Sequence, residues 1–400
     1  LFALTTVILH SSILSSLSLR YLGVDFRSLL QEGLAGQYLL GSYLQPSVFG
    51  VFLVLSVARF VEGREIQAAV FAALATAVHF TYFISSFFLM LSYFIIAKPQ
   101  RRLRMAAVYS LIVLPFLVYV WTVFGPSSPE ISREAQSIIV NQRIPHHCLV
   151  SRWFDVPSMV KIDWVLLALY LTRRTRLFPV LVTSLTLSAA FTVIQVALQS
   201  DALALLFPWR PSVYLVPIAT TVIAGKLLRA LTARLDAAWP LRFVEACGIA
   251  LIGIGVAAMG ADVTWKQCRH RQESNIARLL EYVRQHRSPD QAYLIPIVAL
   301  SHELQQFRLG TGVPIFVDFK SHPYNDREVL VWHRRVEACR GVFRAWNNGH
   351  PLDPADTEAL ERAGVTHAVL RRSTDRPPDG CTVEYSNGSY MAIKLNARMR

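Results

Sequence analysis

The stretch that decides the fold covers residues 177–198 and reads LFPVLVTSLTLSAAFTVIQVAL. It contains no charged side chain, and it follows directly on the basic cluster Arg173, Arg174 and Arg176. A helix of about 20 apolar residues crosses the roughly 30 Å of hydrocarbon in a lipid bilayer. The stretch therefore predicts a membrane-spanning helix with a positively charged end.

Similar apolar runs recur through the first two thirds of the chain and predict a membrane α-helical bundle of about nine spans. Several runs are short, so some spans are expected to be re-entrant or to thin the bilayer. The run from 66 to 97 is divided near His79, where polar residues interrupt it. The expected spans are 1–19, 46–61, 66–79, 80–97, 105–124, 157–172, 177–198, 212–228 and 242–262.

Basic clusters predict the orientation of this bundle. They follow the spans that end near residues 97, 172 and 228, all of which are even-numbered in the expected series. Lys and Arg concentrate in cytoplasmic loops, so we expect this side, and the N-terminus, to be cytoplasmic. The loops 20–45, 125–156 and 199–211 and the C-terminal tail are then outside. Trp153 and Trp209, close to span ends, fit the aromatic belt at the membrane interface.

Composition divides the chain in two. Charged residues make up 17% of the 400 residues, below the roughly 25% of soluble domains, and they reach soluble-protein density only after residue 261. This shift predicts a transmembrane domain over 1–262 and an extracytoplasmic domain over 263–400. The net charge of +13 favours basic loops over a nucleic-acid-binding face, because many basic residues lie between apolar runs. The five cysteines form no CxxC pair, so no zinc site is expected.

The tail alternates between helix and strand patterns, which predicts a soluble α/β domain with a three-layer, partly parallel sheet. The turn Ser386-Asn-Gly-Ser389 predicts a hairpin at the sheet edge. Helices are expected over 273–286, 301–309, 326–346 and 353–364, and strands over 293–297, 314–319, 365–370, 381–385 and 390–395.

Basic and histidine side chains in the expected external loops are the main candidates for an anion site. Arg143, His146, His147 and Arg152 share the loop 125–156, and Arg210 precedes the span 212–228. Arginine suits phosphate because its guanidinium donates paired hydrogen bonds. Structural loop contacts, or an interfacial anchor for Arg210, are the alternatives. Adjacent histidines on an extended chain point to opposite sides, so no metal is expected there.

Other polar residues carry weaker hypotheses. His79 lies between apolar runs, where ionisable groups are costly and often functional, although it could simply cap the bend. Asp25 and Glu32 are the acidic residues of the first external loop and weak candidates for a catalytic base. In the tail, Asp318, Lys320 and His322 follow an expected strand, where α/β sheets bind ligands. No glycine-rich phosphate loop precedes a helix, so no cofactor is evident.

Four motifs resemble those of an uncharacterised family of bacterial polytopic membrane proteins with GT-C-like (membrane glycosyltransferase) architecture. They are Arg143-Ile-Pro-His-His147, Phe207-Pro-Trp-Arg210, Gln306-Phe-Arg-Leu-Gly-Thr-Gly312 and Val317-Asp-Phe-Lys-Ser-His-Pro-Tyr324. The resemblance implies a bacterial inner-membrane protein with a periplasmic domain and a polyprenyl-phosphate-linked sugar as donor. GT-C enzymes generally carry a catalytic acidic residue after their first span. Because this chain begins with Leu, an earlier span and that residue can lie upstream, and neither Asp25 nor Glu32 takes the role by motif.

Two functions therefore remain open. The first is an extracytoplasmic glycosyltransferase-like protein that uses a lipid-linked sugar, for which Arg143 and Arg210 should converge on one cavity. The second is a non-enzymatic envelope transporter, lipid-handling or assembly protein whose outer α/β domain binds a partner. Transport ranks lower because the sequence has no internal repeat and few polar residues within its spans.

Overall fold

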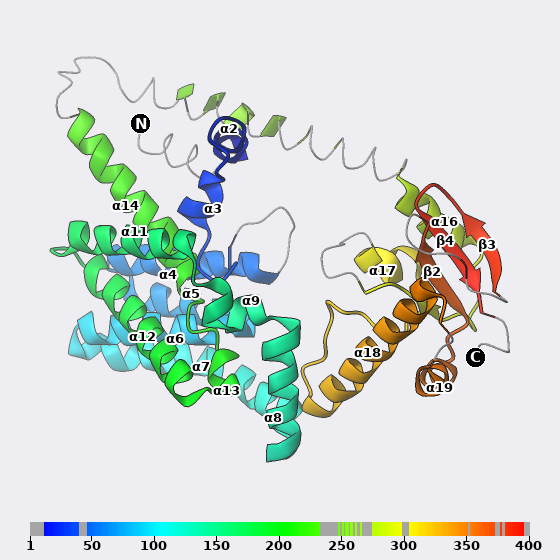
Figure 1. The fold of residues 1–400 in the computed structure, drawn as a ribbon. Coiled ribbons are helices and arrows are strands. Elements are labelled where there is room, and N and C mark those ends of the chain that lie inside the picture. Colours follow the sequence, from blue (N-terminus) through cyan, green and yellow to red (C-terminus); the bar gives the residue numbers. More distant parts are fainter. Residues whose placement is uncertain are drawn as a thin grey trace. The chain divides into compact units, whose positions relative to one another are not determined.

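The computed structural model describes residues 12–39, 46–232, 274–297, 304–350, 353–372 and 381–395, with residue 377 and isolated positions between 247 and 265. Most of the first expected span and much of 242–262 lie outside the described residues. The chain divides into two compact units, residues 1–125 with 136–258 and residues 126–135 with 259–400. Each unit is described by itself (Figure 1).

The first unit is a bundle of helices, and its described residues contain no strand. A further helix, α8 (Pro129–Ile138), passes from the second unit into the first. The helices of the bundle are α2 (Ser12–Leu22), α3 (Phe26–Gln31), η1 (Pro46–Gly50), α4 (Val51–Val61), α5 (Glu65–Val78), η2 (Phe80–Tyr82), α6 (Phe83–Ile96), α7 (Pro99–Phe124), η3 (Ile139–Arg143), α9 (Pro145–Cys148), α10 (Val150–Trp153), α11 (Val156–Thr172), α12 (Leu177–Leu198), α13 (Asp201–Ala204) and α14 (Ser212–Thr232).

Three of the described helices are long and apolar enough to cross a membrane, namely α7, α12 and residues 212–230 of α14. The apolar helices at 47–61, 65–78 and 80–96 are shorter, so the expectation of about nine spans stays a prediction. Helix α7 buries only a narrow stripe, Met105, Tyr109 and Val113. Its other apolar side chains are exposed, with Leu111 at 78%, which suits a lipid environment better than water.

The predicted break near His79 is present. Helix α5 ends at Val78, and His79 takes an extended conformation with φ of −145° before η2 and α6 begin. The backbone N–H of His79 still donates to the carbonyl of Ala75 at 3.1 Å. His79 therefore lies at the C-terminal end of α5 rather than in the middle of one long helix.

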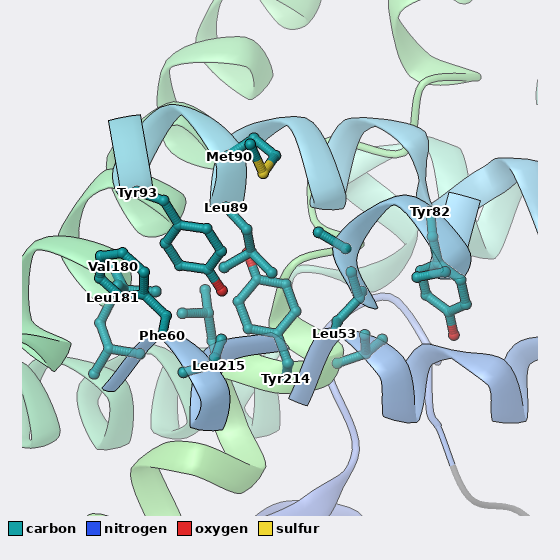
Figure 2. Close-up of a cluster of buried hydrophobic side chains, with 14 of the residues drawn as sticks. Leu53, Phe60, Tyr82, Leu89, Met90, Tyr93, Val180, Leu181, Tyr214 and Leu215 are labelled. Carbon is teal, nitrogen blue, oxygen red and sulfur yellow. The ribbon is translucent and has the colours of Figure 1, made fainter. Parts of the chain in front are cut away.

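The bundle core forms around α5 and α6. The alanines at 68, 69, 72, 73 and 75 of α5 are fully buried, and such small residues let neighbouring helices approach closely. Figure 2 shows the larger side chains of the core, among them Tyr93 and Tyr214. Each phenol group has a buried partner, because Tyr93 shares a 2.9 Å hydrogen bond with Ser56 and Tyr214 donates to Ser184 at 2.8 Å. The two phenol groups are thus satisfied inside the core.

One end of the bundle carries a buried acid between two basic clusters. Glu65, at the first turn of α5, has a 5% exposed side chain and pairs with Arg101 at 2.5 Å and Arg176 at 3.0 Å. Two of the three predicted basic clusters therefore lie together. Burial opposes ionisation of Glu65, but the two arginines outweigh it and lower its pKa. His79 is 14 residues further along α5, roughly 20 Å away, and so marks the opposite end.

The second unit holds a four-stranded mixed sheet in the order β1-β2-β4-β3. Strand β1 pairs parallel with β2, while β4 runs antiparallel to both β2 and β3. The predicted hairpin is thus present, and the sheet is partly parallel. The elements are α16 (Asn275–Gln285), β1 (Tyr293–Leu294), η4 (Leu304–Gln306), α17 (Phe307–Thr311), α18 (Asp326–Asn348), α19 (Pro354–Arg362), β2 (His367–Arg371), β3 (Thr382–Ser386) and β4 (Tyr390–Lys394).

The strand predicted over 314–319 was wrong in extent. Only Ile315 bridges to Tyr293. Pro314 has no N–H to donate, and the side chain of Asp318 accepts from the N–H groups of Lys320 and Ser321, which turns the chain away from the sheet. Both faces of the central strands are nonetheless buried. Val369 and Ala392 pack with α16 in one apolar cluster, and Leu370 and Ile393 on the other face are fully buried.

Candidate anion-binding site

Arg210 is the centre of a polar site at the His79 end of α5. Its Nη2 lies 3.3 Å from Nε2 of His79, and its guanidinium carbon lies 4.7 Å from the centre of the Tyr82 ring. Because arginine can only donate, Nε2 of His79 accepts in this contact. Among the residues that the structure describes, no carboxylate forms an ion pair with Arg210. Burial lowers the pKa of Arg210, an effect that Tyr82 partly offsets.

His147 is the second basic group of the site. Its Nδ1 lies 2.5 Å from the carbonyl oxygen of Ala35, so Nδ1 carries the proton and Nε2 keeps its lone pair. Burial is the largest cause that lowers the pKa of His147 to about 4; the bond to Ala35 opposes it, and His146, Arg210 and Arg143 add to the lowering. The charges of both arginines thus act on one neutral imidazole.

The loop at residues 33–37 forms one wall of the site. Leu34 donates its N–H to the hydroxyl of Ser212 at 2.8 Å, and Lys161 donates to the carbonyl of Gly33 at 3.1 Å. With the His147 bond to Ala35, side chains from three elements hold three successive residues. The loop is therefore fixed against α9, α11 and the start of α14.

Several residues assigned to this site carry buried polar atoms without a hydrogen-bond partner among the described residues. These atoms are the two amide atoms of Gln37, the hydroxyl of Ser47, the indole N–H of Trp209 and Nε of Arg210. Ser47 belongs here because its carbonyl accepts from the hydroxyl of Tyr82. Buried polar groups in native proteins almost always have partners. Unpaired polar atoms on the residues of a cationic site favour a polar ligand there.

Two of the three described non-glycine residues with positive φ border the site, and the third, Gln199, ends α12. Ala35, whose carbonyl binds His147, has φ of 56°, and Phe207, three residues before Arg210, has φ of 51°. A left-handed conformation at a residue with a side chain costs of order 1–3 kcal/mol and is often found at functional sites. The strained Phe207 accepts a 2.8 Å backbone hydrogen bond from Arg210, which orients the arginine.

The structure does not bring all predicted residues together. Arg143, at the end of the π-helical turn η3, acts electrostatically on His147, whereas Arg152 is exposed and its side chain bonds to no described residue. The two histidines were predicted to point apart; that was wrong, because α9 is a helical turn and the ring centres lie 4.1 Å apart. No group of three or more metal-binding side chains occurs among the described residues.

The two acidic candidates have local structural contacts. Asp25 accepts from the N–H of Arg27 and caps α3, and Glu32 accepts from the hydroxyl of Ser28 at 2.8 Å. Neither contacts Arg210 or His147. Trp153 and Trp209 are buried against each other with ring centres 5.7 Å apart. Their place at the membrane interface stays a prediction.

The sequence reasoning missed Gln37, Tyr82, Ser212 and Lys161 as members of the site. Lys161 alone left a signal, because a charged residue within an apolar helix is costly and often functional. Its amino group is buried and reaches a backbone carbonyl 128 positions earlier in the chain. The other three are ordinary residues whose role depends on contacts distant in sequence.

An apolar cavity of about 420 Å³ lies in the same unit, between α3, α11 and α14. Its walls include Phe26, Leu30, Trp164 and Leu227. Helix α3 leads directly into the loop at 33–37, so one chain segment borders both the cavity and the Arg210 site. The polar site and the apolar cavity are therefore neighbours along this segment.

The three tail candidates lie in the second unit. Asp318 holds a turn with its side chain, and its carbonyl accepts from the indole of Trp332 at 2.8 Å. The ring of His322 is tilted against those of Tyr324 and Trp332, with centres 5.6 Å and 6.2 Å apart. Lys320 is exposed.

Comparison with known proteins finds a family model that matches part of the second unit. Residues 274–339 match a family described as a domain of unknown function, DUF6798. The match covers α16, β1, α17 and the first part of α18, less than half of the chain. No curated protein matches the sequence. The fold and the site thus define a mostly helical protein with membrane-length helices, a small mixed α/β unit and a cationic site.

Proposed function

We propose that this chain is a polytopic membrane protein of the bacterial inner membrane that binds a polyprenyl-phosphate-linked sugar and acts in extracytoplasmic glycosyl transfer. One observation carries the proposal: Arg210 contacts His79 and Tyr82, its Nε is buried without a partner, and no described carboxylate forms an ion pair with it. A lipid phosphate would supply the missing negative charge and accept hydrogen bonds from Arg210 and Gln37.

The position of the site supports an external location. The basic clusters around Glu65 are expected to face the cytoplasm, and the Arg210 site lies at the opposite end of α5. In the membrane, the apolar cavity beside α3 would accept part of the isoprenoid chain. These features together suit a phosphate carried on a lipid better than a free soluble anion.

A lipid-handling role without transfer is the second candidate. Neither Asp25 nor Glu32 reaches Arg210 or His147, and Nε2 of His147 keeps its lone pair. A site that binds phosphate without a carboxylate base suits a binding protein. The two functions differ in one measurable event, the release of polyprenyl phosphate from a lipid-linked sugar.

The test uses the full chain in lipid nanodiscs and a short-chain polyprenyl phosphate. The R210Q variant should weaken binding by roughly 10- to 100-fold, because a hydrogen bond to a charged group is worth about 1.5–3 kcal/mol. The matched R152Q variant, at an exposed arginine, should bind like the wild type. Equal affinities of R210Q and wild type, or equal binding of the unphosphorylated polyprenol, would refute the proposal. Release of polyprenyl phosphate from its sugar-linked form then separates transfer from lipid handling.

A further inference from the structure

A second pocket lies within the α/β unit. It has a volume of about 360 Å³, within the range of roughly 300–1,000 Å³ typical of small-molecule sites. It is formed by Arg308 of α17, by the chain from Ile315 to Pro323 and by one face of α18. The pocket lies wholly within the segment that matches the family of unknown function.

Aromatic side chains form part of its wall. Phe316 and Trp332 both line the pocket. Trp332 is fixed in place, because its indole N–H donates to the carbonyl of Asp318 and its ring stacks on Phe319 with centres 5.9 Å apart. The negative face of such a ring attracts polarised C–H groups. A rigid aromatic wall of this kind suits the C–H face of a sugar ring.

Charged groups are separated along the pocket. Glu328 and Arg335 lie on the same face of α18, seven residues and so roughly 10 Å apart along the helix axis. Arg335 also lies over Phe316, with its guanidinium carbon 5.8 Å from the ring centre. The side chains of Arg308 and Glu328 form no hydrogen bond or ion pair with any residue that the structure describes. Asp318 also lines the pocket, but its side chain already accepts from the N–H groups of Lys320 and Ser321. The pocket thus offers two guanidinium groups and, two helical turns from Arg335, the carboxylate of Glu328 as an acceptor for hydroxyl groups.

We propose that this pocket binds an acidic sugar, a hexuronate unit. Its carboxylate pairs with Arg308 and Arg335, its hydroxyl groups donate to Glu328, and its ring packs on Phe316 and Trp332. A neutral sugar lacks a partner for the two arginines, and a simple anion leaves the aromatic wall and Glu328 unused. The proposal holds whether or not the Arg210 site takes part in glycosyl transfer.

The experiment measures binding of glucuronate, glucose and inorganic phosphate to the full chain in nanodiscs. All variants carry R210Q as well, so that anions held by Arg210 do not contribute. Calorimetry should give a Kd for glucuronate at least tenfold lower than that for glucose. The R308Q variant should raise the Kd for glucuronate roughly tenfold and change the Kd for glucose less than twofold. The matched R334Q variant, at an exposed arginine of the same helix outside the pocket, should leave both unchanged.

A second variant tests the aromatic wall. The W332F variant should weaken the binding of glucuronate and of glucose by similar factors, because it changes the ring that both sugars contact. The proposal is overturned if glucose and glucuronate bind equally well, or if R308Q and R334Q behave alike. It is also overturned if phosphate binds as tightly as glucuronate, since the pocket would then be a simple anion site.

Discussion

Replacement of Glu65 by glutamine should destabilise the bundle by about 2–3 kcal/mol. The glutamine keeps the shape of the side chain but removes the charge that Arg101 and Arg176 contact at 2.5 Å and 3.0 Å. Each charge-assisted hydrogen bond is worth roughly 1.5–3 kcal/mol when buried. The side chains of Arg101 and Arg176 are 51% and 41% exposed, so solvent screening brings the sum of the two down to the stated range.

The assay is reversible unfolding of the purified protein in mild detergent, with E62Q as the matched control. Glu62 pairs with Arg59 at 2.7 Å, but its side chain is 48% exposed, so its loss should cost about 0.5 kcal/mol. The pKa of Glu65 is lowered from 4.5, so its contribution is complete above pH 4.5 and is lost as the pH falls through the folded-state pKa. If the free energies of unfolding of E65Q and E62Q differ by less than 0.5 kcal/mol, the pairing of Glu65 with the two arginines does not stabilise this end of the bundle.

Three further predictions test other parts of the first unit. Because the pKa of His147 is about 4 rather than 6.5, the unfolded chain alone takes up a proton between these values, and stability should fall by up to about 3 kcal/mol from pH 6.5 to pH 4. When the free energy of unfolding is measured against pH, H147N should reduce this loss of stability between pH 6.5 and pH 4. H350N, at an exposed histidine, should not change it. A72L places a larger side chain at a fully buried position of α5 and should cost about 1–3 kcal/mol, whereas Q67L on the exposed face should cost little in the same melting experiment. Y93F loses the 2.9 Å hydrogen bond to Ser56 and should cost about 1 kcal/mol; an unchanged midpoint would mean that this bond contributes nothing.

Features that depend on neighbouring residues were predictable from the sequence. The break at His79 followed from polar residues that interrupt an apolar run, and the hairpin between β3 and β4 followed from the Asn-Gly turn. Helix α19 begins as expected, with Asp353 as its N-cap and Pro354 at its first position. In each case the residues that cause the feature lie within one turn of it, so a local pattern contains the necessary information.

Features that depend on distant contacts were not predictable. The predicted strand at 314–319 fails because Asp318 accepts hydrogen bonds from the residues that follow it. Several apolar helices are short, and α5 has only 14 residues. Fewer helices than predicted are therefore long and apolar enough to count as membrane spans. Within the site, Arg210 stood out by its charge at a span end. Gln37 did not, because only the folded loop reveals that its amide is buried without a partner.

The two ends of α5 give the strongest internal argument for an anionic ligand. At one end, two arginines converge on Glu65, and the fold itself supplies the neutralising carboxylate. At the other end, Arg210 meets His79, Tyr82 and a strained loop, but no carboxylate among the described residues. Burial of a charge is costly unless it is paired, and the same bundle pairs its arginines where no ligand is needed. The contrast indicates that the partner of Arg210 comes from outside the described chain, as a bound anion would.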